Sequence, residues 1–308
     1  MTIRRIFECK QQKNMGLALS LIITFLICTG ANVQQNQRAA APKNCLWEVQ
    51  GSSNRVFLLG SLHIFKSDAY PLAKAIDDAY RVSPKVVFET DIAGMADTAV
   101  QARMLSMGFY PEGQSLFQNI SAPMRDALQK RVANLGLPLE QFGRLKPWLA
   151  AVTLTHAELQ RLGFSPAYGV DVHYFSRART DKKKIAFLES IDYQISLLGD
   201  MGAEDQKAFL GQTLKDLEIA ADLAGDMLVY WQKGQTDKLY TLLFKSFEGY
   251  PEIEDRLLLQ RNKDWVVKIE AMLEEPENVF IVVGAGHLIG DESVVDLLRQ
   301  KGYKVRQR

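Results

Sequence analysis

The sequence predicts an α/β protein whose central sheet is built from two β-(Gly-x-x-His)-α-β repeats at the ends of the chain, with a helical insertion between them. Three observations lead to this fold class. Near both ends, a short apolar strand runs directly into a Gly-x-x-His turn that is followed by a helix and a second strand. Between the ends, apolar residues recur at helical spacing. The 308 residues, of which 47% are hydrophobic, can bury the core that this fold needs.

The first unit begins with a predicted hairpin. Residues 47–50 and 55–59 are two extended segments around a turn cluster, and the second segment runs into Gly60-Ser-Leu-His63. A helix over residues 71–82 follows. The β-branched run of residues 85–91 then has the length and composition of a buried strand.

The second unit repeats this plan at the carboxyl end. The strand 278–283 leads into Gly284-Ala-Gly-His287, Asp291 caps a helix that ends at Gly302, and residues 303–306 form the last strand. Strand-crossover-strand units usually build parallel pairs, so we expect the two ends to share one sheet. The same order of elements at both ends indicates an internal repeat.

The middle of the chain, about residues 96–250, is expected to be a helical insertion or layer over the sheet. The apolar spacing there and just beyond predicts helices over residues 121–136, 210–224, 236–243 and 251–273. Pro251 stands in the first turn of the last helix, where proline is well tolerated. Residues 184–189 are predicted to be a short strand that ends on a carboxylate, Glu189.

The first 31 residues are predicted to be a secretory signal peptide. Basic side chains precede an apolar stretch from Gly16 to Cys28, and small residues follow it. The stretch has 13 residues, fewer than the roughly 20 that a bilayer-spanning helix needs. An uncleaved membrane anchor is the alternative. Residues 32–44 are expected to be a flexible tether, and residues 45–308 a single exported domain, either periplasmic or extracellular.

The charge balance argues against nucleic acid as a partner. The chain carries 37 basic and 36 acidic residues, a net charge of +1, and so lacks the basic field that phosphate backbones attract. Cleavage after residue 31 removes four basic residues and one acidic residue, which leaves a net charge of −2. It also leaves Cys45 as the only cysteine, so the exported chain has no internal disulfide. Membrane contact is expected only through the N-terminal segment, if it stays uncleaved.

Two of the four histidines, His63 and His287, occupy the same Gly-x-x-His context directly after a strand. In open α/β sheets such strand ends are where sites assemble, and glycine lets the backbone approach a ligand closely. Equivalent positions in a repeat would bring both imidazoles to the same edge of the sheet. The alternative is that the two histidines are unrelated and stand beside ordinary turns.

Two carboxylates, Glu89 and Asp91, follow the strand of the first unit. Alternation along a strand would place both on one face, and a carboxylate that leaves an apolar strand needs a cation, a metal or hydrogen-bond partners. Two imidazoles with one carboxylate are a common ligand set for Zn²⁺ and, with more oxygen ligands, for Mn²⁺ or Co²⁺. The sequence therefore predicts a divalent metal, of unknown identity, held by His63, His287, Glu89 and Asp91. Alternatively, Glu89 caps a helix or pairs with a surface lysine.

Arg261 and Asn262 fall inside the apolar stripe of the last long helix, away from its wet face. A buried guanidinium requires an acceptor, and Glu89, Glu189 or an anionic group of a substrate would satisfy Arg261. A structural buried salt bridge is the alternative. Asp171, near the start of a helix, is a further candidate for the site.

The motifs together resemble the TraB/GumN family, within a wider group that includes the Tiki-type proteases and, more distantly, the erythromycin-esterase and haem-uptake ChaN-like proteins. The resemblance covers residues 46–305. It is carried by Leu59-Gly-Ser-Leu-His63, Phe88-Glu-Thr-Asp91, Tyr168-Gly-Val-Asp171, Leu188-Glu189 with Gln194, Arg261-Asn262 with Trp265, and Val283-Gly-Ala-Gly-His287-Leu288.

The resemblance implies a peptidase-like site. In Tiki-like relatives the paired Gly-x-x-His motifs and a glutamate are proposed to form a metal-dependent peptidase centre, which corresponds here to His63, His287 and Glu89. The pheromone-shutdown branch of the group is described as reducing the activity of a signalling peptide, by cleavage or by sequestration.

Our hypothesis from the sequence is an exported metal-dependent hydrolase that acts on a peptide or another small molecule. The metal would activate water, a carboxylate would take the proton, and Arg261 would stabilise the oxyanion or anchor a substrate carboxylate. Asn262, Asp171 and Glu189 would support these groups. A metal-free variant with one histidine as general base is equally compatible with the sequence. The rival hypothesis is a non-catalytic module that sequesters a peptide or a small hydrophobic ligand.

Overall fold

A computed structural model describes residues 43–308 except for 245–246 and 248–249. The predicted signal peptide lies outside the described residues, and so does the predicted tether apart from residues 43 and 44. In the described part, no helix is long and apolar enough to cross a membrane.

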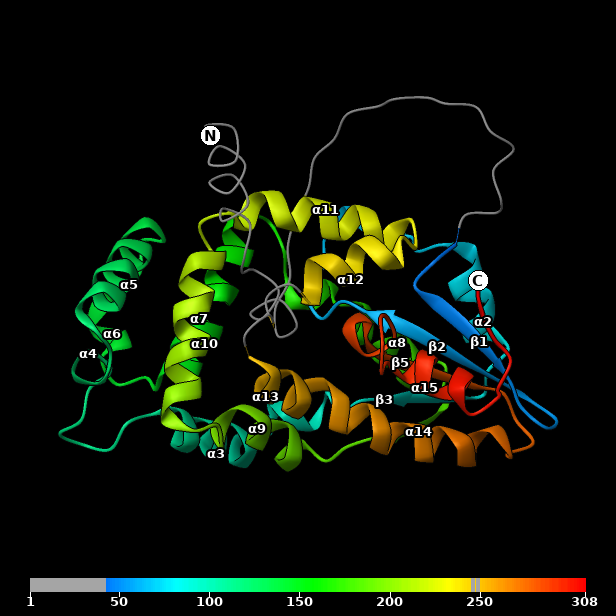
Figure 1. Cartoon of the computed structure of the whole chain (residues 1–308). Coiled ribbons are helices and arrows are strands. Elements are labelled where there is room, and N and C mark those ends of the chain that lie inside the picture. Colours follow the sequence, from blue (N-terminus) through cyan, green and yellow to red (C-terminus); the bar gives the residue numbers. More distant parts are fainter. Residues whose placement is uncertain (1–42, 245–246, 248–249) are drawn as a thin grey trace, which may run out of the picture.

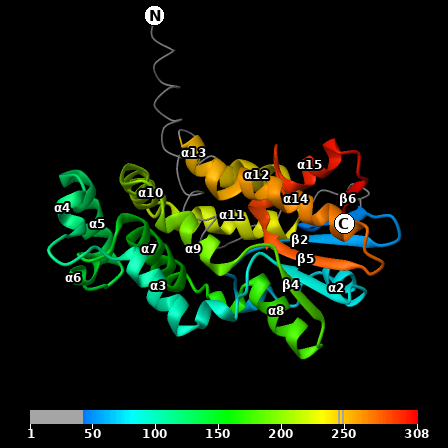
Figure 2. The same cartoon turned by 90° about the horizontal axis from the view of Figure 1, so that it is seen from below.

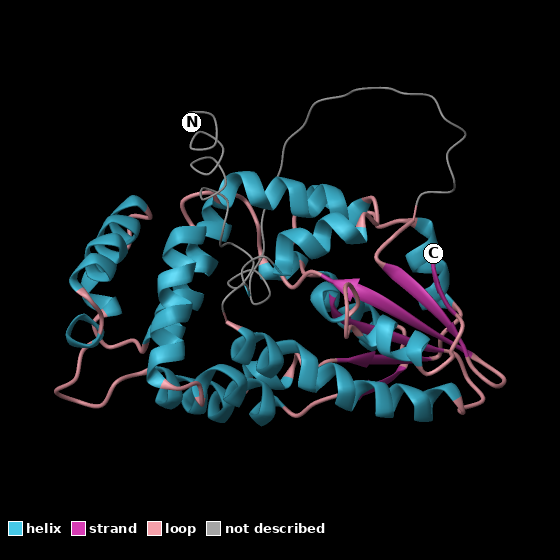
Figure 3. Ribbon diagram, in the orientation of Figure 1, coloured by secondary structure: helices cyan, strands magenta, loops and turns pink. Residues whose placement is uncertain are grey.

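One mixed sheet forms the centre of the α/β fold (Figure 3). Its strands are β1 (Leu46–Gln50), β2 (Arg55–Ser61), β3 (Lys85–Phe88), β4 (Lys184–Phe187), β5 (Val279–Gly284) and β6 (Val305–Gln307). Their order is β4-β3-β5-β2-β1-β6. Strands β4, β3, β5 and β2 are parallel, whereas β1 is antiparallel to both β2 and β6.

The strands of both chain ends lie in this one sheet, as the sequence predicts. Strand β5 is inserted between β2 and β3, and β6 pairs with β1 at the far side. The two end units therefore interleave and do not form two separate strand-helix-strand layers. The internal repeat itself stays a prediction.

The helices flank the sheet and extend to one side of it. They are α2 (Lys74–Arg81), α3 (Thr98–Gly108), α4 (Leu116–Asn119), α5 (Ala122–Asn134), α6 (Leu139–Phe142), α7 (Pro147–Arg161), α8 (Val170–Thr180), α9 (Ile191–Gly199), α10 (Ala203–Asp216), α11 (Ala220–Gln232), α12 (Thr236–Phe244), α13 (Pro251–Glu254), α14 (Gln260–Leu273) and α15 (Val294–Gln300). A π-helical turn, η6 (Asp255–Leu259), joins α13 to α14. The predicted long helix from Pro251 to Leu273 is therefore helical throughout, with one wider turn.

Several element boundaries differ from the predictions for local reasons. The helix expected from Asp291 begins at Val294, because Ser293 is the residue whose hydroxyl accepts the capping hydrogen bond from Asp296. The apolar stripe over 210–224 is divided between two helices, α10 and α11, which are separated by a short turn. Strand β3 ends at Phe88, so the carboxylates that follow it lie beyond the paired residues.

The central strands are buried on both faces, which explains their continuous apolar sequence. Every residue of β5 except its last glycine is buried. In Figures 1 and 2, α14 and α15 lie over one face of the sheet, and α2 and α8 lie over the other. Helices α3 to α7, with α9 and α10, extend away from the strands, and α5 is far from the sheet in both views. The carboxyl ends of the parallel strands open towards this helical part.

Candidate active site

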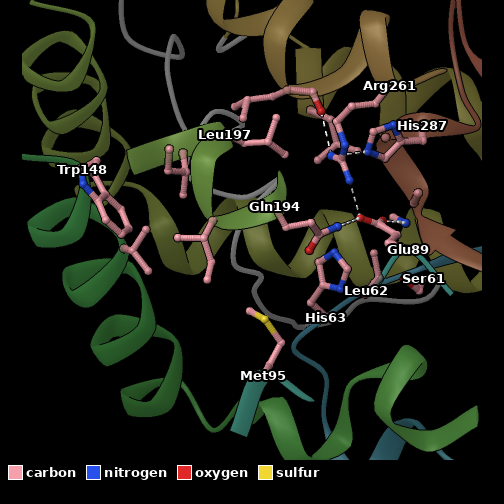
Figure 4. Close-up of a pocket in the computed structure, with 18 of the residues that line it drawn as sticks. Ser61, Leu62, His63, Glu89, Met95, Trp148, Gln194, Leu197, Arg261 and His287 are labelled. Carbon is pink, nitrogen blue, oxygen red and sulfur yellow. Dashed lines mark hydrogen bonds and ion pairs between the residues drawn. The ribbon is translucent and has the colours of Figure 1, made fainter. Parts of the chain in front are cut away.

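The paired Gly-x-x-His turns meet at one edge of the sheet. Strands β2 and β5 are parallel neighbours, and their register sets Ser61 opposite Gly284. A Cβ atom on Gly284 would lie 3.2 Å from Glu89 Oε1 and 3.6 Å from His63 Nε2 and His287 Cδ2. Three side chains from three segments therefore surround this glycine, because the carboxyl ends of parallel strands lie at the same edge. Figure 4 shows His63, Glu89 and His287 grouped in this way with Arg261.

His63 forms a charged pair with Asp171. The distance from His63 Nδ1 to Asp171 Oδ2 is 2.6 Å, and Nδ1 donates because an ionised carboxylate only accepts. The pair is held by its backbone, since the amide of Val170, at the start of α8, donates to the carbonyl of Leu62. His63 lines the cavity described below and its Nε2 lies close to Gly284.

The surroundings of His63 favour its protonated form. Burial alone would lower the pKa of His63, but the charge and hydrogen bond of Asp171, with the charge of Glu89, raise it from 6.5 to about 9. Arg261 acts in the opposite direction and offsets part of the rise. At neutral pH His63 is therefore mainly an imidazolium ion between two carboxylates.

Arg261 lies at the centre of the site and is only 5% exposed. Its Nε donates to Glu189 Oε1 at 2.9 Å, and its Nη2 donates to Glu189 Oε2 at 2.9 Å and to Glu89 Oε2 at 2.7 Å. Its Nη1 donates to the carbonyl of Leu257 at 2.9 Å and lies 3.0 Å from His287 Nε2. The carboxylate partner that the apolar stripe demanded is thus present twice.

These contacts use all five N–H groups of the guanidinium, which is the full donor capacity of arginine. A direct contact of Arg261 with a substrate oxyanion or carboxylate, the role predicted from the sequence, would require one of these contacts to break, and it stays a prediction. In this arrangement Arg261 positions Glu89, Glu189 and His287. The π-helical turn η6 helps to hold the guanidinium, because the carbonyl of Leu257 in this turn accepts a hydrogen bond from Arg261, which lies four residues later in the chain.

Glu89 is an ionised, fully engaged carboxylate. Its Oε1 accepts from the amide of Gly284 at 2.6 Å, and its Oε2 accepts from Arg261 and, at 3.0 Å, from Gln194 Nε2. Burial would raise the pKa of Glu89, but the charge of Arg261, together with other interactions that include the charge of His63 and the hydrogen bond from the Gly284 amide, holds this pKa well below its usual range. Glu89 is therefore a weak proton acceptor and acts as a fixed negative charge.

His287 is neutral and has both ring nitrogens in hydrogen bonds. Nδ1 lies 2.6 Å from Asn262 Oδ1 and donates to it, which leaves Nε2 as the acceptor for Arg261. Burial, together with the charge of Arg261, lowers the pKa of His287 well below 6.5. Asn262 is itself held by its Nδ2, which donates to the carbonyl of Glu292 at 3.0 Å. The predicted supporting role of Asn262 thus has a direct partner in the site.

Asp91 does not join the other predicted site residues. Its Oδ1 accepts from the backbone amide of Ala93 at 3.0 Å. Since β3 ends at Phe88, the strand alternation that would have aligned Asp91 with Glu89 does not extend this far. Asp91 therefore closes a local turn.

Three further residues contribute to the site although their roles were not predicted. Gln194 bridges the two glutamates, because its Nε2 donates to Glu89 and also to Glu189 at 3.1 Å. Trp265 Nε1 donates to Glu189 Oε1 at 2.7 Å. Ser61 is 2% exposed, and its Oγ has no hydrogen-bond partner in the described part of the chain. In the sequence, the position of Ser61 inside the first Gly-x-x-His motif was the feature that could have indicated its place in the site.

A cavity of about 370 Å³ opens beside this polar cluster. One end is lined by polar groups that include Ser61, His63 and Glu89. The rest of the wall is apolar and comes from the helical part of the chain, with side chains Met95, Met104, Trp148, Leu149, Val152, Ile195, Leu197, Leu198, Leu243 and Leu257. Figure 4 shows Trp148 on the opposite side of the view from the two histidines, and Met95 below His63. Such a cavity suits a ligand with one polar reacting group and a large apolar part.

The predicted metal ligands do not form a ligand set in this arrangement. Over the described residues, no group of three or more His, Cys, Asp or Glu side chains is positioned to hold a metal ion. Both nitrogens of His287 and both oxygens of Glu89 are used, Asp91 lies apart, and a guanidinium stands among the remaining carboxylates. As arranged here, these residues do not form a ligand set for a divalent ion, and the metal itself stays a prediction.

Comparison with known proteins places the chain among bacterial and animal relatives. The family model described as TraB/PrgY/gumN matches residues 45–307. The uncharacterized protein YbaP of Escherichia coli is 27% identical over 80% of this chain and 89% of its own length. An uncharacterized protein of Treponema pallidum is 24% identical over 92% of this chain and 90% of its own length. The protein of Danio rerio named Metalloprotease TIKI2 is 38% identical over 81% of this chain, which spans 57% of that protein. No solved structure matches the chain significantly.

Proposed function

The chain belongs to the TraB/PrgY/gumN family, and on that premise we propose that it is an exported hydrolase that cleaves peptides with a large apolar residue beside the cleaved bond. The observation that carries the proposal is the His63–Asp171 pair, at 2.6 Å, on the wall of the cavity. The name of the TIKI2 relative supports peptide hydrolysis, and the mainly apolar wall supports an apolar residue in the substrate.

The proposed reaction is attack of water on the scissile carbonyl. In the molecules in which His63 is neutral, its Nε2 accepts a proton from water as the water oxygen bonds to the carbonyl carbon, and the carbonyl electron pair moves to the carbonyl oxygen. Asp171 holds the ring and stabilises the imidazolium that results. When the oxyanion collapses and the C–N bond breaks, His63 returns the proton to the leaving amine. Ser61 Oγ is the donor proposed for the oxyanion, because it has no partner within the described residues.

The experiment that tests this proposal is hydrolysis of a quenched fluorescent peptide library by the purified chain. The library is assayed with EDTA and, in parallel, with Zn²⁺, Mn²⁺ or Co²⁺. Turnover should be lost in His63→Gln and kept in His156→Gln, since His156 lies on α7 and does not line the cavity. Equal activity in wild type and His63→Gln, or turnover only with added metal, would contradict the metal-free mechanism.

A binding role is the second candidate, because the mainly apolar wall suits capture of an apolar ligand without chemistry. In that case, peptides from the same library bind to wild type, and no member of the library is cut under any condition. Leu197→Arg, which would introduce a charge into the apolar wall, should then abolish binding. That pattern would reject the hydrolase and favour sequestration.

Export is proposed from the N-terminal sequence. Residues 1–31 fused to a reporter that is active only outside the cytoplasm should give a signal, and mass spectrometry of the exported chain should locate the cleavage. A reporter that stays inactive would contradict export. We propose a peptide or another small molecule as the partner, no nucleic acid, and membrane contact only if residues 1–31 are retained.

A further inference from the structure

We infer that the guanidinium of Arg261 is the resident cation of this site, and that it occupies the position among Glu89, Glu189 and His287 that a divalent ion would need. Arg261 and a metal ion then exclude one another in this chain. The inference concerns the charge architecture of the site and holds whether or not the chain is a hydrolase.

The acceptors around Arg261 are the kinds of atom that bind divalent metals. They are three carboxylate oxygens, from Glu89 and Glu189, and the lone pair of His287 Nε2. Each lies between 2.7 and 3.0 Å from a guanidinium nitrogen. A lone pair of a carboxylate or imidazole that accepts a hydrogen bond from N–H at this distance points at the donor and is not available to coordinate a metal ion. The guanidinium therefore takes the coordination that carboxylates and imidazole would otherwise offer to zinc or manganese.

The charges lead to the same conclusion. Glu89 and Glu189 are nearly buried beside Arg261, with side-chain exposures of 11% and 5%. One guanidinium already neutralises one of these two carboxylates, and a divalent ion added beside it would be repelled across a few ångströms in a medium of low dielectric constant. The histidine that has a free nitrogen, His63, is already expected to be cationic at neutral pH.

The surrounding residues fix Arg261 in place. Trp265 Nε1 and Gln194 Nε2 donate to Glu189, so this carboxylate is held from three sides as it receives the guanidinium in a bidentate contact. The carbonyl of Leu257 anchors Nη1 from within the same helical segment. Displacement of Arg261 by a metal would leave a buried guanidinium without its carboxylates, which is strongly unfavourable.

The test compares metal binding by wild type, Arg261→Ala and a matched control, Arg256→Ala. Arg256 lies in η6 and donates to the carbonyls of Ser196 and Leu197, so its removal frees no carboxylate. Each protein is dialysed against Zn²⁺, Mn²⁺ or Co²⁺ and then against buffer, and bound metal is counted by mass spectrometry. We expect wild type and Arg256→Ala to retain no stoichiometric ion. Arg261→Ala should retain one that is lost when Glu89→Gln is added, and its melting temperature should rise with metal.

Two outcomes would overturn the inference. The first is stoichiometric metal in wild type that is lost in Glu89→Gln, and the second is a folded Arg261→Ala that still binds no metal. If Arg261→Ala does not fold, ¹⁵N-arginine spectra of wild type decide. The Nε–H signal of Arg261 is assigned as the one that disappears in Arg261→Lys, if that variant folds, and otherwise as the arginine Nε–H signal that is most protected from exchange. This signal should not shift or broaden when Zn²⁺ or Mn²⁺ is added. A shifted or broadened signal would refute the inference.

Discussion

Replacing Asp171 by Asn removes the negative charge that faces His63 and should lower the pKa of this histidine. Asp171 contributes both a charge and a hydrogen bond to the rise of the pKa of His63 from 6.5 to about 9, whereas burial and Arg261 act against it. With Asp171 neutralised, the charge of Glu89 is left to raise the pKa of His63. Because a close opposite charge shifts a pKa by about 1–3 units, we expect the pKa of His63 to fall by about two units, to about 7.

The pKa is measured by NMR titration of histidine-labelled protein in EDTA-treated buffer. The chain has four histidines, so the signal of His63 is assigned by its loss in His63→Gln. Asp91→Asn is the matched control, because Asp91 is a carboxylate two positions after Glu89 in the chain that caps a turn and does not contact His63. It should leave the pKa of His63 unchanged.

The same change has a consequence for activity. If neutral His63 is the base, log(kcat/KM) of wild type should rise with pH and level near pH 9, and in Asp171→Asn the levelling should move to lower pH by the same interval. The reasoning is refuted if wild-type His63 titrates near 6.5, or if its pKa stays near 9 in Asp171→Asn.

Three further predictions concern stability and the roles of single side chains. Because the pKa of His63 in the folded state lies above its unfolded value of 6.5, the stabilisation from Asp171 should be complete below pH 6.5 and disappear as the pH rises through about 9. Urea unfolding of wild type and Asp171→Asn measures this difference in stability. A difference that grows with pH would contradict the prediction. Ser61→Ala should lower peptide turnover but leave the melting temperature unchanged or higher, because Ser61 Oγ has no partner in the described part of the chain. The control Ser83→Ala should lower the free energy of unfolding by about 1 kcal/mol, because it removes a buried hydrogen bond. Equal destabilisation by both substitutions would disprove this prediction. Glu189→Gln should destabilise the fold by about 3 kcal/mol, because it leaves a buried guanidinium with less compensation, and a loss below about 1 kcal/mol in denaturant titration would show that this ion pair is not important for folding.

Local sequence determined much of the frame of this protein. The apolar runs before each Gly-x-x-His turn correctly predicted buried strands, because burial on both faces requires apolar side chains at every position. The apolar stripe around Arg261 correctly indicated a buried arginine that needs a carboxylate, since helical spacing fixes which side chains share a face. Both statements depend on residues within one element, where backbone geometry relates sequence spacing to direction.

Tertiary structure decided how the site residues combine. His63 and Asp171 are 108 positions apart in the chain, and only the packing of α8 against the turn after β2 brings them to hydrogen-bond distance. Packing also gave Arg261 two glutamates and one histidine as partners at once, which used its donors. The apolar wall of the cavity comes from several helices for the same reason. Local periodicity specifies which side chains must be buried, but it does not specify which distant segment will satisfy them.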